Sequence, residues 1–280
     1  MAPTSVPIAS ARHRAFRFRF PAVAGLCLLL ALPAAAQRQA EPLGRGMVAV
    51  RNSSTVVHVG WRLLAGDPAG VTFNLYRSAD GGAPVKLNAQ PLATTTDYTD
   101  TPPNLSTTAY RYHVRAVAGG VEGPASAAAT LPANATIGRY LTVPIQAPPG
   151  AAPPYDVKFC WVGDLDGDGE YDFVVDRHST TSSTDHQYLE GYLRDGTFLW
   201  RVDMGPNSVD KYSIEPGSSA ISVGAHDNVT VYDMDGDGKA EVLVRTANGV
   251  VLGDGATVTA ADETTQFISM LDGMTGAERS

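Results

Sequence analysis

The sequence predicts an all-β protein in which a β-sandwich is followed by the first blades of an incomplete β-propeller. Glycine and proline are frequent, at 28 and 19 of 280 residues, and no long stretch has helical periodicity. An acidic nine-residue pattern also occurs twice, each time between short apolar runs. A repeat of this kind is typical of blades or other stacked units.

The two acidic patterns are residues 164–172 and 233–241. Carboxylates at alternate positions of a tight turn converge on one point, the seventh position offers a backbone carbonyl, and the ninth closes the cage. Such an all-oxygen donor set favours Ca²⁺. The predicted ligands are Asp164, Asp166, Asp168, Glu170 and Asp172, followed by Asp233, Asp235, Asp237, Lys239 and Glu241.

Two other interpretations of the acidic patterns are possible. An Asp-Gly pair is common in plain hairpin turns, which need no metal. An EF-hand loop requires a Glu at its twelfth position and helices on both sides. Val175 and Val244 stand at that position here, and the flanking runs are β-rich. The sequence therefore favours a strand, a calcium loop and a strand, in which the ion has a structural role.

Residues 1–36 resemble a signal peptide and predict secretion. Four arginines precede the apolar run 22–32, and small residues at 34–36 precede Gln37. The run is short for a membrane span, although a membrane anchor is the alternative. No membrane span is expected once the signal is removed.

Charge and cysteine content limit the function further. The formal net charge is −8, and it becomes −12 without residues 1–36, which hold four arginines and no acid. Such a chain is not expected to bind nucleic acid. Cys160 is the only cysteine after the signal, so no intrachain disulfide is expected. Its apolar surroundings indicate a core position, and we expect a monomer.

Residues 43–132 are predicted to form the sandwich. The segment Tyr110–Val117 alternates apolar and polar residues, as a half-buried strand does. With Trp61, Phe73–Arg77 and Thr96–Asp100, it resembles a fibronectin type III module. Trp61 and Tyr98 are expected in the core, with sugar stacking as the alternative. The expected strands are 48–50, 56–61, 72–78, 85–87, 110–117 and 125–129.

The rest of the chain is predicted to be a Pro-rich linker, residues 133–154, and a partial propeller, residues 155–280. The linker is expected to hold one strand at Tyr140–Ile145. In the propeller, strands are expected at 157–162, 173–176, 187–193, 198–202, 229–232, 241–246 and 266–271. Two units cannot close a propeller of about four to eight blades. We therefore expect a truncated N-terminal fragment, with an open two-blade sheet as the alternative.

Several longer strings resemble the rhamnogalacturonan lyases of polysaccharide lyase family 11. They are Gly44–Val50, Val162–Glu170, Leu199–Asn207 and Val231–Val242. The resemblance implies a complete propeller that cleaves rhamnogalacturonan I by β-elimination. A base would remove the C5 proton of galacturonate, while Ca²⁺ or a cationic side chain neutralises the adjacent carboxylate.

The catalytic base cannot be assigned from the sequence. The candidate substrate-binding residues are Glu215, His226, Asp227 and Arg245, near the second acidic loop. Arg177 and His178, which follow the expected strand 173–176, are further candidates. For each of them, a solvated loop residue or a local ion pair is the alternative. We expect no lyase activity from these 280 residues alone. The alternative functions are a non-catalytic calcium-dependent carbohydrate-binding or adhesion protein and a structural calcium-dependent surface module.

Overall fold

β-strands make up all the regular secondary structure in the part of the chain that the structure describes. The structure is a computed structural model, and it describes residues 41–148, 155–180, 185–206, 208, 229–262 and 265–279. All of these lie within one compact unit, residues 39–280. The predicted all-β class is confirmed. The predicted signal peptide lies outside the described residues.

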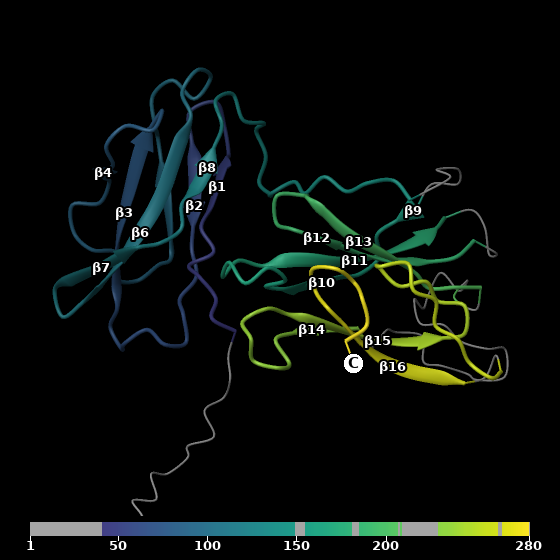
Figure 1. The fold of residues 1–280 in the computed structure, drawn as a ribbon. Helices are drawn as coiled ribbons and strands as arrows, with labels where there is room; N and C mark the ends of the chain where they lie inside the picture. The colour runs from purple at the N-terminus through teal and green to yellow at the C-terminus, as the bar shows by residue number, and fades with distance from the viewer. Residues whose placement is uncertain are drawn as a thin grey trace, which may run out of the picture. The chain divides into compact units, whose positions relative to one another are not determined.

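The first eight strands form two antiparallel sheets (Figure 1). The order of the first sheet is β1-β2-β5, and that of the second is β4-β3-β6-β7, with β8 paired to β6. The strands are β1 (Val48–Arg51), β2 (Val57–Gly60), β3 (Thr72–Ala79), β4 (Val85–Lys86), β5 (Asp97–Asp100), β6 (Tyr110–Ala118), β7 (Val121–Ala125) and β8 (Ala129–Leu131).

Both sheets contribute to one core, as expected for a sandwich. Strand β6 buries Tyr110, Tyr112 and Val114 on the face that the alternation predicts. Trp61 is buried beside Phe73, with ring centroids 5.6 Å apart. Tyr98 packs against the same core. Both aromatic residues therefore stabilise the fold, as the first of the two interpretations predicted.

The later strands form two antiparallel sheets with blade-like strand order (Figure 1). The first has the order β10-β11-β12-β13, with β9 paired to the far end of β11, and the second has the order β14-β15-β16. The strands are β9 (Tyr155–Asp156), β10 (Cys160–Gly163), β11 (Asp172–Ser179), β12 (Tyr188–Tyr192), β13 (Phe198–Asp203), β14 (Thr230–Tyr232), β15 (Glu241–Ala247) and β16 (Gln266–Leu271).

The two later sheets repeat one another in register. Val175 pairs with Glu190 in the first sheet, and Val244 pairs with Ser269 in the second. A Cβ atom on Gly163 would lie 2.5 Å from Cγ1 of Val231, so only glycine allows the first strands of the two sheets to approach this closely. One hydrophobic core, which includes Leu165 and Val242, extends across both sheets.

Three local predictions are wrong. Cys160 is exposed because β10 is an edge strand whose outer face is uncovered in the described part of the chain. Residues Tyr140–Ile145 form no strand, and Tyr140 is 76 % exposed, because no neighbouring strand pairs with them. The expected strand 125–129 is interrupted, because Ala125 ends β7, residues 126–128 are no strand, and Ala129 begins β8.

Candidate functional site

The first acidic loop joins β10 to β11 and gathers three carboxylates. One oxygen from each of Asp164, Asp166 and Asp172 lies within 4.8 Å of the others. Asp164 and Asp172 are buried, with 1 % and 2 % exposure. Gly167 and Gly169 have φ angles of 82° and 87°, a left-handed conformation that glycine adopts without strain. The loop sequence therefore produces the turn that the prediction requires.

Backbone amides orient the carboxylates of this loop. Oδ1 and Oδ2 of Asp164 accept hydrogen bonds of 2.8 Å from the amides of Gly167 and Gly169. Oδ2 of Asp172 accepts one of 3.0 Å from the amide of Leu165, and its Oδ1 accepts one of 2.8 Å from the amide of Arg194. Each carboxylate oxygen has two lone pairs, so one remains for a cation.

Electrostatics favours a cation at this loop. Burial and the charges of Asp166 and Asp168 raise the pKa of Asp172 to about 6. Burial, followed by the same two charges, also raises the pKa of Asp164. Concentrated negative charge in a desolvated site is relieved by a positive ion. The donor set is all oxygen, and it fits a hard divalent cation such as Ca²⁺.

The second loop joins β14 to β15 and reproduces the geometry of the first. Oxygens of Asp233, Asp235 and Glu241 lie within 4.8 Å of one another, and Glu241 is 1 % exposed. The amides of Gly236 and Gly238 donate to Asp233, as their equivalents do to Asp164. Strands flank both loops, which rules out the EF-hand interpretation.

The remaining predicted ligands lie outside these three-carboxylate clusters. Asp168 and Asp237 accept hydrogen bonds from the amides two residues later, at 2.7 Å and 2.9 Å. Glu170 was predicted to contribute only its backbone carbonyl. Its side chain is buried and contacts residues at the start of the sandwich segment. The side chain of Lys239, at the equivalent place in the second loop, is exposed.

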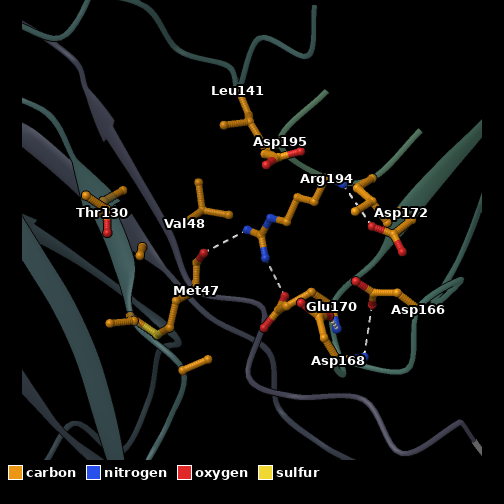
Figure 2. A pocket seen from close by; sticks show the side chains of 15 residues that line it. Met47, Val48, Thr130, Leu141, Asp166, Asp168, Glu170, Asp172, Arg194 and Asp195 are labelled. Atoms are coloured by element: carbon orange, nitrogen blue, oxygen red, sulfur yellow. Dashed lines mark hydrogen bonds and ion pairs between the residues drawn. The ribbon is translucent and has the colours of Figure 1, made fainter. Parts of the chain in front are cut away.

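Arg194 links the first loop to the segment before β1 (Figure 2). Its guanidinium donates to the carboxylate of Glu170 and, at 2.7 Å, to the backbone carbonyl of Met47. Arg62 lies 3.6 Å from the same carboxylate. A cavity of about 530 Å³ borders this cluster, and Asp166 and Asp168 line it on the loop side.

A second polar cluster lies at the end of the β10–β13 sheet that is away from the acidic loop. Nδ1 of His186 lies 2.8 Å from Oδ1 of Asp203, and both side chains are about one third exposed, at 36 % and 31 %. The hydroxyl of Tyr155 donates to the backbone carbonyl of His186, and the rings of Tyr155 and Tyr188 are 5.5 Å apart. These residues match no motif in the sequence. The expected strand order could have indicated them. The start of β12 lies beside the end of β13 because the two strands are antiparallel.

Three of the four candidate substrate-binding residues, Glu215, His226 and Asp227, lie outside the described residues. Arg245 lies on β15, and its Nη1 donates to Oε1 of Gln266 at 3.1 Å. Burial lowers the pKa of the Arg245 guanidinium.

The two other candidates, Arg177 and His178, follow one another on β11. Arg177 is 4 % exposed, and its guanidinium lies 3.0 Å from the buried carboxylate of Glu190. It therefore makes a local ion pair, the alternative interpretation of this residue. Nδ1 of His178 is buried and has no hydrogen-bond partner among the described residues.

Comparison with known proteins identifies matches over both parts of the chain. Residues 38–131 match a family model described as the rhamnogalacturonan I lyases beta-sheet domain. Residues 140–277 match the model of rhamnogalacturonan lyase family 11, C-terminal domain. The chain is 37 % identical over 237 residues to the rhamnogalacturonan endolyase YesW of Bacillus subtilis, covering 80 % of this chain and 34 % of YesW.

Two further relatives give the same result. The chain is 34 % identical over 246 residues to the rhamnogalacturonan exolyase YesX of Bacillus subtilis, covering 82 % of this chain and 36 % of YesX. A crystal structure of YesW superposes with a TM-score of 0.67, covering 86 % of this chain and 41 % of that one. A Bacillus licheniformis rhamnogalacturonan lyase superposes with a TM-score of 0.66 over the same shares. The chain thus spans about a third of the length of its curated relatives.

By its fold and its acidic loops, the protein is a β-sandwich joined to blade-like sheets that each carry a carboxylate cluster. The chain belongs to the family 11 rhamnogalacturonan lyases. Among the described residues, no helix has the length and apolar character needed to cross a membrane.

Proposed function

We propose that this chain forms part of a secreted lyase that cleaves rhamnogalacturonan by β-elimination. The observation that carries the proposal is the match of two rhamnogalacturonan lyase family models to residues 38–131 and 140–277. One relative is named an endolyase and the other an exolyase, so the proposal extends to the substrate and bond but not to the cleavage mode.

The chemistry requires a face that binds an acidic sugar and orients its proton at C5. We assign this role to the end of the β10–β13 sheet that carries His186 and Asp203. It is the end of the strands away from the acidic loop. An imidazole held by a carboxylate binds hydroxyl and carboxylate groups in a fixed orientation. Tyr155 and Tyr188 add aromatic surface beside it, which suits sugar rings.

The two acidic loops are proposed as Ca²⁺ sites with a structural role. A bound Ca²⁺ supplies positive charge to the clustered carboxylates. The chain's own contribution is the orientation of Asp164 and Asp233 by two backbone amides each. These carboxylates point into their own turns, whereas His186 lies at the end of the β10–β13 sheet that is away from the first acidic loop. The calcium sites and the substrate face are therefore separate.

Glycan binding tests the proposal directly. The chain should bind rhamnogalacturonan I more tightly than homogalacturonan, because only the former presents alternating rhamnose. Replacing His186 by Ala should weaken this binding about tenfold. The matched control is His58→Ala on β2, which should leave it unchanged. Equal binding of both polymers, or no effect of H186A, would contradict the proposed face.

The activity of the chain alone is read from the ultraviolet absorbance of the double bond that elimination creates. We expect no rise when the chain is incubated with rhamnogalacturonan I and Ca²⁺, since the match covers only 34 % of YesW and 36 % of YesX. A rise would place the whole reaction within these 280 residues. We also propose export through residues 1–36, a monomeric state and no nucleic-acid partner, the last on the strongly acidic charge.

A further inference from the structure

One arginine lies directly against the carboxylates of the second loop. Nη2 of Arg279 lies 2.9 Å from Oδ2 of Asp235 and 3.9 Å from Oδ2 of Asp237. Its Nη1 donates to Oε1 of Glu241. The backbone amide of Arg279 donates to Met270 on β16 at 2.8 Å, so the segment that carries it is paired to the sheet. The guanidinium therefore meets two of the three clustered carboxylates.

The first loop has no equivalent counter-charge. Lys239 lies beside Gly167, and Arg62 contacts Glu170, but within the described part of the chain neither forms an ion pair with the clustered carboxylates. The guanidinium of Arg194 contacts Glu170 and the carbonyl of Met47. Only its backbone amide reaches a clustered carboxylate, that of Asp172. Among the described residues, no ion pair is formed by Asp164, Asp166 or Asp172. The two loops thus share a sequence pattern and a backbone but differ in charge balance.

We propose that Arg279 is a tethered cation that competes with Ca²⁺ at the second loop, so that the two loops bind Ca²⁺ with different affinities. This inference rests on the proposed calcium sites. A guanidinium keeps its proton in proteins, so its charge cannot be removed to make room for a metal. Ca²⁺ at the second loop must displace Arg279 or share Asp235 and Glu241 with it. Either costs affinity that the first loop keeps.

A second consequence concerns the apo protein. Arg279 offsets the mutual repulsion of the second-loop carboxylates without any metal. The second loop should therefore keep its turn when Ca²⁺ is removed, whereas the first loop should lose it. The sequence repeat alone would predict that the two loops respond alike.

Calcium titration of the whole chain by calorimetry tests the inference. The wild-type protein should show two classes of site that differ about tenfold in Kd. Asp166→Asn should remove the tighter class and Asp235→Asn the weaker. Arg279→Met keeps the aliphatic stem without the charge and should bring the weaker Kd to within about threefold of the tighter one. The matched control, Arg111→Met on β6, removes one positive charge that forms no ion pair with either loop among the described residues, and should leave two classes.

The outcomes separate the inference from the calcium proposal. Two equal sites in the wild-type protein, or no difference between R279M and R111M, would overturn the role of Arg279 and leave the calcium sites standing. Calcium binding to none of the variants would overturn both. Arg279→Lys keeps a charge and should leave the two Kd values further apart than R279M does, which separates loss of charge from damage to the fold. Circular dichroism of each variant reports the fold independently.

Discussion

The carboxylate of Glu170 accepts a hydrogen bond of 3.0 Å from the backbone amide of Gly46, which lies 124 positions earlier in the chain. The carbonyl of Gly169 accepts another from the amide of Gly44. The first acidic loop is therefore fixed to the segment that leads into β1. A loop whose sequence indicates a metal site has a second role, which is to hold distant parts of the chain together.

Glu170→Ala should reduce the free energy of unfolding by about 2 kcal/mol, because it leaves Gly46, Arg62 and Arg194 without their carboxylate partner. The control is Lys239→Ala at the equivalent, exposed position of the second loop, which should change it by less than about 0.5 kcal/mol. Urea denaturation in saturating Ca²⁺ measures both. Equal effects would contradict the stabilising role of the Glu170 side chain.

Removal of Ca²⁺ should destabilise the later sheets and spare the sandwich. Hydrogen exchange of the amides of Gly167 and Gly169 should accelerate in chelator, because the carboxylate of Asp164 that they bind loses its counter-charge. Strand β6 should keep its protection. At a Ca²⁺ concentration about a hundredfold above the Kd of the tighter site, the stabilisation lost at that site is about 3 kcal/mol. Equal exchange with and without chelator would argue against structural calcium.

Glu190→Gln, in the β10–β13 sheet, should reduce the free energy of unfolding by about 3 kcal/mol. The carboxylate is fully buried between Arg177, at 3.0 Å, and Arg201, at 2.6 Å, so its loss leaves charge uncompensated in the interior. The comparison variant is Ser269→Ala, the equivalent position of the second sheet, which should cost about 1 kcal/mol because it removes one neutral hydrogen bond. Thermal unfolding of both variants measures the two losses of stability. A larger loss in S269A would contradict this ranking.

Acidification should weaken the sandwich through His113. Burial, followed by the positive charge of Arg115, lowers the pKa of this imidazole, which stacks on Tyr76. The unfolded chain therefore takes up a proton first, and the free energy of unfolding falls as the pH drops below about 6.5. His113→Phe keeps the stacking without the titration.

The measurement is the free energy of unfolding of both proteins at about pH 7.5 and about pH 5.5 in saturating Ca²⁺. The wild type should lose more stability than H113F over this interval. An equal loss would show that other groups carry the pH dependence. The comparison cancels titration of the acidic loops, which both proteins share.

The sequence predicted the features that local spacing determines. The loop turns follow from the alternating acids and the glycines at Gly167 and Gly236, which have φ angles of 82° and 83°. Strand β6 follows from its alternation. The contacts of the Glu170 side chain with Gly46 and Arg194 could not be predicted in this way, because these partners lie far from Glu170 in sequence. The exposure of Cys160 depends on the edge position of β10, which apolar composition does not reveal.

Buried polar pairs distinguish the two later sheets where their backbones agree. Arg177 and Glu190 occupy in the first sheet the register positions that Thr246 and Ser269 occupy in the second, where the two hydroxyls are 2.7 Å apart. If β11 paired with β16 during folding, the guanidinium of Arg177 would meet a hydroxyl instead of a carboxylate, and several kcal/mol would be lost. We therefore expect these buried pairs to disfavour the exchange of strands between the two similar sheets, within one chain or between two copies.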